Sequence, residues 1–128
     1  YEKFSLNYIQ KIISSTYTEG VPVIYYSRSK SNFDKLKNLD IDCIGISSEN
    51  NLGDMYKFFD EKFAIQGNLN TDILKEDKDT IKKGVIKTLE TFPFETGHVF
   101  NLGTGITPDI HPDKVSYLVD QVRELSVK

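Results

Sequence analysis

Short apolar runs alternate with helical patterns along this 128-residue chain, and that alternation constrains its fold more than any other feature. The apolar runs lie at residues 21–26, 41–46, 63–69 and 98–102. Each is followed by apolar residues three or four positions apart, as in "NLGDMYKFF", which is the spacing of an amphipathic helix. Strands that alternate with helices are typical of βα units and a parallel sheet. The sequence therefore predicts four βα units in the α/β class.

The helices are predicted from apolar spacing and from their boundary residues. An amphipathic helix is expected before the first strand, with its apolar face formed by Phe4, Tyr8, Ile9, Ile12 and Ile13. Asp77 or Asp79 is suited to cap a longer helix, and Pro112 to open the last one. The inward face of that last helix is expected to comprise Val115, Leu118, Val119, Val122 and Leu125. The run at 21–26 is apolar enough for a strand covered on both faces.

Four βα units fit either an open α/β sheet or part of a closed (β/α)₈ barrel. A full barrel takes about 250 residues, so this chain could supply half of one. The sequence begins at Tyr1, within a helical pattern and without a capping residue, so we expect residues 1–128 to be a single segment of a longer polypeptide. Half a barrel leaves two sheet edges unpaired, and we do not expect the segment alone to be a stable monomer.

Composition excludes several classes of protein. A net charge of −3 argues against a general nucleic-acid binder, which usually carries a basic face. The sequence has no apolar run near the roughly 20 residues that cross a bilayer, so no membrane partner is predicted. Its one cysteine, Cys43, cannot form an internal disulfide or a multi-thiolate metal site, and we expect it in the core. A cytoplasmic location is the simplest expectation.

Ligands in parallel α/β folds bind at the loops that follow the carboxyl ends of strands. These loops contain "SRSKSN", "SSEN", "QGNLN" and "GTGITP". In the last, Gly103 and Gly105 flank Thr104, and glycine permits a positive φ and close approach of a ligand. Successive N–H groups in such a loop could bind an anion. The alternative, which spacing alone favours, is a turn that uses glycine only for its geometry.

Other polar residues near the predicted strand ends have two interpretations each. The amides of Gln66 and Asn68 could contact a polar substrate, but such amides more often tie loops to backbone groups, which we favour. Arg28 and Lys30 could attract a carboxylate, with a solvated loop as the favoured alternative. His98 and His111 lack a metal-type partner two or four positions away, so structural roles are predicted for both. The residues alone predict a binding scaffold, without a metal site or a nucleophile–base pair.

Three stretches resemble the carboxyl-terminal part of the uroporphyrinogen decarboxylases. They are "VPVIYYSR", "AIQGNLNTDIL" and "GHVFNLGTGITPDIHPDKVSYLVDQVREL". The resemblance implies that this chain forms the C-terminal half of a (β/α)₈ TIM-type barrel, usually a homodimer, without a metal or organic cofactor. It also implies decarboxylation of the four acetate side chains of uroporphyrinogen, which gives coproporphyrinogen in haem biosynthesis.

The resemblance also bears on the site. It places the family's principal arginines, its pyrrole-binding aspartate and its substrate-contacting tyrosine upstream, so no catalytic residue is assigned to this chain. It implies that Gly103, Thr104 and Gly105 contact substrate. The family's histidine falls at Thr104, its aspartate at Asn70 and its proline at Thr71. A threonine hydroxyl can hydrogen-bond a carboxylate but, unlike histidine, does not titrate near neutral pH.

Two other functions stay open at this point. One is a degenerate, non-catalytic homologue or fragment that binds porphyrinogen or a protein partner. The other, ranked lower, is a corrinoid-dependent methyltransferase of the same superfamily, which would hold zinc with His and Cys ligands. Thr104 in the glycine loop and the solitary Cys43 argue against the methyltransferase.

Overall fold

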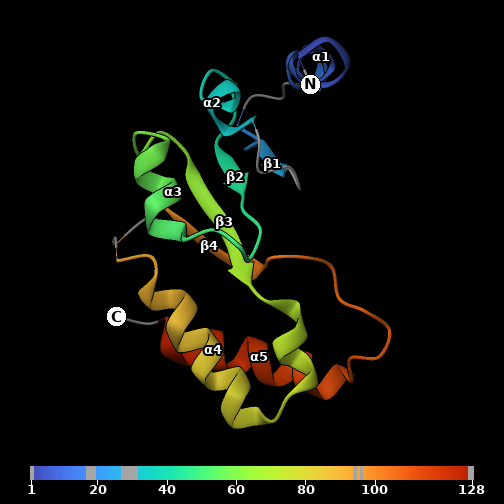
Figure 1. The fold of residues 1–128 in the computed structure, drawn as a ribbon, viewed down its shortest axis with the longest axis vertical. Coiled ribbons are helices and arrows are strands. Elements are labelled where there is room, and N and C mark those ends of the chain that lie inside the picture. Colours follow the sequence, from blue (N-terminus) through green and yellow to red (C-terminus); the bar gives the residue numbers. More distant parts are fainter. Residues whose placement is uncertain (1, 17–19, 27–31, 94, 96, 127–128) are drawn as a thin grey trace.

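The computed structural model describes residues 2–16, 20–26, 32–93, 95 and 97–126. Its strands are β1 (Ile24–Tyr26), β2 (Cys43–Gly45), β3 (Ala64–Leu69) and β4 (His98–Leu102). The α-helices are α1 (Asn7–Thr16), α2 (Phe33–Leu36), α3 (Leu52–Phe58), α4 (Lys78–Glu90) and α5 (Pro112–Leu125). A π-helical turn η1 (Glu2–Leu6) precedes α1, and a 3₁₀ turn η3 (Thr71–Lys75) follows β3. Strands and helices therefore alternate as predicted (Figure 1).

The four strands form one parallel sheet in the order β1-β2-β3-β4. Each strand thus pairs with the next one along the chain. Doubly wound open sheets instead reverse their strand order at a switch point, whereas barrels keep sequential order. The observed order confirms the α/β prediction and matches part of a (β/α)₈ barrel.

The sheet is strongly curved. Tyr26 ends β1 and Gly103 follows β4, yet the Tyr26 hydroxyl donates a hydrogen bond to the Gly103 carbonyl oxygen at 3.0 Å. In a flat sheet three strand spacings would separate β1 from β4 by about 14 Å, more than a tyrosine side chain can span. The curl brings the carboxyl ends of the outer strands together, as a barrel wall requires.

Two buried clusters hold the helices to the sheet. The first lies between the strands and the helices α2 and α3, which flank one side of the sheet in Figure 1. Its fully buried members include Leu36, Ile44, Leu52, Phe59 and Ile65. The second joins the ends of β3 and β4 to η3, α4 and α5, and includes Leu69, Leu74, Ile81, Val85 and Leu118.

Two elements differ from the sequence-based expectation. The run at 21–26 was expected to be covered on both faces, but this is wrong: β1 is three residues long, with Ile24 52% and Tyr26 44% exposed. As an edge strand, β1 pairs only with β2 in the described structure. Val119 was expected to face inward, but it is also exposed, although Leu118 beside it is buried.

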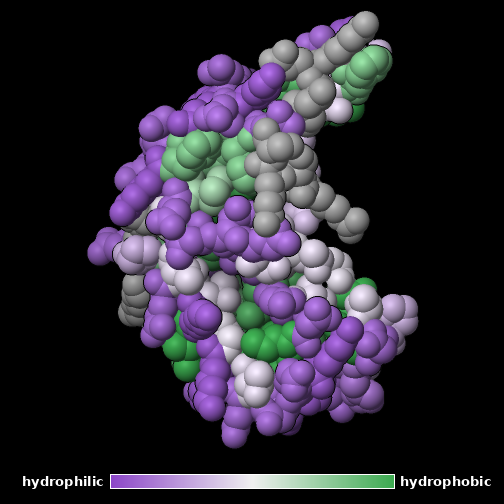
Figure 2. Space-filling view, in the orientation of Figure 1, coloured by the Kyte–Doolittle hydropathy of each residue, from purple (hydrophilic) through white to green (hydrophobic). Residues whose placement is uncertain are grey.

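The first helix is amphipathic as predicted, but its apolar face is only partly covered. Ile13 is buried, and Ile9 packs against the first cluster. Phe4, Tyr8 and Ile12 remain between 60% and 77% exposed, and Figure 2 shows hydrophobic residues at the surface of α1. Exposed apolar side chains at this end of the sheet are suited to association. In the described residues no helix is long and apolar enough to span a bilayer.

We expect the 128-residue segment, expressed alone, to associate rather than remain a stable monomer. Its sheet has two outer strands, β1 and β4, and unpaired strand edges beside exposed apolar side chains promote association. Analytical ultracentrifugation over a concentration series measures this directly. A monodisperse monomer that also unfolds cooperatively on heating would contradict the expectation.

Candidate functional site

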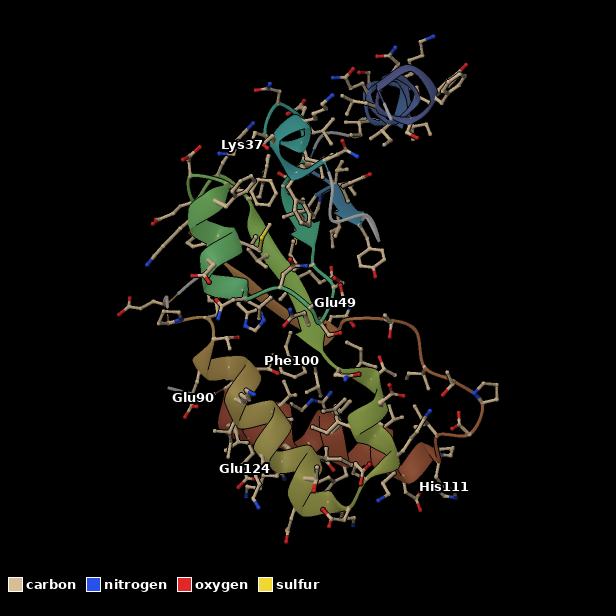
Figure 3. All side chains as sticks on the ribbon, in the orientation of Figure 1. Lys37, Glu49, Glu90, Phe100, His111 and Glu124 are labelled. Atoms are coloured by element: carbon tan, nitrogen blue, oxygen red, sulfur yellow. The ribbon has the colours of Figure 1, made fainter. Side chains whose placement is uncertain are left out.

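The carboxyl ends of the parallel strands meet at one edge of the sheet, and the candidate site lies there. Loops that follow β2, β3 and β4 converge at this edge. Figure 3 shows Glu49, in the loop after β2, close to the tips of the strands. Arg28 and Lys30, predicted in the loop after β1, lie outside the described residues.

Gly103 is the fixed point of the glycine loop, which we define as residues 103–111. Its N–H donates to the Leu69 carbonyl at 2.8 Å, and its own carbonyl accepts from Tyr26. A Cβ atom at Gly103 would lie 2.5 Å from the backbone nitrogen of Ser48. Glycine is therefore required because the loop after β2 packs directly on it.

This finding corrects the expected use of the two glycines. Neither Gly103 nor Gly105 has a positive φ, so left-handed geometry is not their function. Close approach does matter at Gly103, but the approaching group is the protein's own Ser48 backbone. Around Gly105 a Cβ would meet no atom within 4 Å. The outer part of the loop, including Thr104 and Gly105, is exposed and accessible to a ligand.

The glycine loop is tied to η3 at both of its ends. At the near end, the buried Thr71 hydroxyl lies 2.9 Å from both the carbonyl oxygen and the hydroxyl oxygen of Thr104. At the far end, the Lys75 ammonium lies 3.2 Å from the Asp109 carboxylate. The carboxylate of Asp72 and, to a smaller extent, that of Asp109 hold the pKa of Lys75 above its ordinary value. The loop is therefore held against η3 rather than hanging free.

Asn68 and Gln66 have different surroundings. The Asn68 amide nitrogen donates to the carbonyls of Ser47 and Asn50 at 2.8 and 2.7 Å, which is the loop-tying role that we favour. Gln66 is half-buried in β3, in register with Gly45 and Val99. Its amide makes no hydrogen bond to the side chains or backbone that the structure describes. Of the two amides, Gln66 is therefore the better placed to meet a ligand.

The histidines have the predicted structural roles. Nε2 of His98 lies 2.7 Å from the Gly67 carbonyl, and the ring stacks on Phe92 with 5.1 Å between centroids. Because a carbonyl only accepts, Nε2 must carry the proton. Burial lowers the pKa of His98, so the ring is neutral at pH 7. His111 caps α5 by accepting from the Asp113 N–H, far from the strand tips (Figure 3).

Two further residues make contacts at this edge of the sheet that the sequence did not predict. Tyr26 was assigned only to a strand, and Ser48 was noted only as a departure from the family's sequence after the second strand, without a contact. Their contacts with Gly103 depend on the curl of the sheet. Its position gave a signal for Tyr26, since residues at the carboxyl ends of barrel strands contribute to the site.

Among the described residues, this edge offers neutral hydrogen-bonding groups beside the carboxylate of Glu49. Thr104 contributes an exposed hydroxyl and Gln66 a half-buried amide, and such groups bind and orient polar ligands. Thr71 and Asn68 instead hold the loops together. The described residues include no cluster of three or more His, Cys, Asp or Glu side chains that could hold a metal ion. Cys43 is buried in β2 as expected, and burial raises the pKa of its thiol.

The two glycines of the loop provide a matched pair of variants. We expect Gly103→Ala to lower the free energy of unfolding by about 1–3 kcal/mol, because its methyl group would overlap the Ser48 backbone. Gly105→Ala should change that free energy by less than about 0.5 kcal/mol, since its Cβ enters open space. Denaturant titration of the natural polypeptide that carries this segment measures both. Equal effects of the two substitutions would show that packing against Ser48 does not explain Gly103.

Comparison with known proteins identifies the family. The family model described as uroporphyrinogen decarboxylase matches residues 1–125. A uroporphyrinogen decarboxylase of Pseudomonas putida is 33% identical over 133 residues, covering 100% of this chain and 38% of that protein. A Legionella pneumophila protein of the same name is 33% identical over 129 residues, covering 98% of this chain and 37% of the relative. The chain thus spans well under half the length of these relatives, and it belongs to the uroporphyrinogen decarboxylase family.

Proposed function

We propose that this chain forms the carboxyl-terminal half of a barrel that decarboxylates the four acetate side chains of uroporphyrinogen to give coproporphyrinogen. The match over residues 1–125 supports this proposal. So do the sequential strand order and the curl of the sheet, because they suit a barrel wall. The remainder of the barrel, a homodimeric assembly and a cytoplasmic location belong to the same proposal.

The observation that carries the proposal is the position of the glycine loop. Gly103 fixes the loop at the carboxyl end of β4, where barrel enzymes bind their ligands. Thr104 and Gly105 are exposed beyond that anchor. Of the predicted contacts Gly103, Thr104 and Gly105, we therefore assign substrate contact to the exposed Thr104 and Gly105 and the anchoring of the loop to Gly103. Gln66 is a further candidate contact on the inner face of the sheet.

A second candidate function is binding of a porphyrinogen without turnover. It is favoured by the neutral character of Thr104, whose hydroxyl group does not titrate near pH 7. The two candidates differ in one observable. A decarboxylase releases coproporphyrinogen, whereas a non-catalytic homologue binds the substrate and returns it unchanged.

We expect Thr104→His to raise the rate of coproporphyrinogen release by the natural polypeptide that carries this segment. An imidazolium adds a positive charge that holds a substrate carboxylate more strongly than a neutral hydroxyl does. The measurement is coproporphyrinogen release at pH 6.5–7, near the ordinary histidine pKa of about 6.5.

Ser116→His is the matched control, because Ser116 is exposed on α5. This substitution adds the same ring away from the loop and should leave the rate unchanged. An unchanged rate with Thr104→His would mean that Thr104 does not limit the rate of coproporphyrinogen release. Failure of the parent protein to form any coproporphyrinogen would overturn the decarboxylase proposal.

A further inference from the structure

We propose that a cavity beside helix α4 binds a small neutral ligand with neighbouring hydroxyl groups, such as a polyol or a monosaccharide. This space, which we call the α4 cavity, is lined by residues 48–51 after β2, residues 68–70 at the end of β3, and part of α4. Its volume of about 410 Å³ falls within the range of about 300–1,000 Å³ that is typical of small-molecule sites. The proposal goes beyond the decarboxylase function and does not depend on it.

Two polar side chains that line the α4 cavity are almost completely buried. Thr88 is 7% exposed and Asn68 is 8% exposed. The Asn68 amide nitrogen donates to the backbone carbonyls of Ser47 and Asn50. Among the described residues, neither the Asn68 Oδ1 atom nor the Thr88 hydroxyl has a hydrogen-bond partner. Both atoms still reach open space, since the one fully enclosed side-chain atom without a partner in the described chain is Oε1 of Gln121.

Such a pair of atoms indicates an occupant of the cavity. Polar groups in the interior of folded proteins nearly always have a hydrogen-bond partner. The described part of the chain supplies none to the Asn68 Oδ1 atom or to the Thr88 hydroxyl. The molecule that fills the cavity therefore has to supply both partners.

Exposed residues add further polar groups to the lining of the α4 cavity. Lys87 is exposed on α4 and makes no hydrogen bond or ion pair with the described residues. The side-chain oxygens of Asn51 and Asn70 already accept from backbone N–H groups of the turns that follow them. What these two side chains offer to a ligand is therefore their amide N–H groups. Glu49, labelled in Figure 3, contributes a carboxylate.

This set of groups favours hydroxyl groups over a charged ligand. The opposite charges of Lys87 and Glu49 balance, so an anion would meet Glu49 and a cation would meet Lys87. A hydroxyl group has one proton to donate and two lone pairs to accept. It can thus donate to the Asn68 Oδ1 atom and accept from an amide or ammonium N–H at the same time. Leu69 and Ile73 add apolar lining, which suits the C–H groups of a sugar ring or polyol.

Binding is tested by NMR titration of the natural polypeptide with glucose, with the Asn68 side-chain amide and the backbone amides of Lys87 and Thr88 as reporters. We expect these signals to shift and to saturate. Tetrahydropyran, the same ring without hydroxyl groups, and propionate, a small anion, should leave them in place at equal concentration. Absence of any shift with glucose would show that the cavity holds water only and would overturn the proposal. Equal or larger shifts with tetrahydropyran or propionate would overturn the chemical class.

Variants then locate the binding site. Thr88→Val removes the buried hydroxyl with little change of shape and should weaken glucose binding about five-fold, as expected for one lost hydrogen bond. Thr88→Ser should retain binding. Lys87→Met should also weaken binding, and because Lys87 is exposed this variant does not depend on repacking of the interior. Lys83→Met is the matched control, since Lys83 is exposed on the same helix but does not line the cavity. Glucose affinity that neither Thr88→Val nor Lys87→Met changes would overturn the assignment of the site.

Discussion

The structure depends on the contacts that meet at Gly103. The Gly103 N–H is bonded to the end of β3, its carbonyl accepts from Tyr26 at the end of β1, and its Cα faces the loop after β2. A single residue without a side chain therefore joins the carboxyl ends of the outer strands of the sheet. These contacts hold the curl, and the curl gathers the loops into one edge where a ligand can be bound.

Local signals were sufficient to predict much of the fold. β4 has the predicted bounds at 98–102, Pro112 opens α5 and Asp77 caps α4. These features depend on neighbours within a few residues, which a sequence displays directly. The exposure of Ile24 was missed because it depends on what covers the far face of β1. α2 ends at Leu36, although the helical spacing of buried leucines continues to Leu39.

The site was predictable in position but not in detail. The rule that ligands bind after barrel strands identifies the glycine loop from sequence alone. The pairing of Thr71 with Thr104 was not visible, because 33 positions separate them and the register of β3 against β4 brings them together. The reason for Gly103 was hidden in the same way, since Ser48 approaches it only in the folded chain. The fold thus brings Thr71 and Thr104, two positions at which the sequence departs from the family, together as one hydrogen-bonded pair.

The anchoring of Gly103 is tested most directly by amide hydrogen exchange followed by NMR in the natural polypeptide that carries this segment. A buried amide that donates to the adjacent strand should exchange only through wider opening of the structure. We expect the Gly103 N–H to be protected as strongly as the amides of β3 and β4, and the N–H of Gly105 to exchange far faster. Equal, rapid exchange at both glycines would contradict the account, because the loop would then have no fixed point.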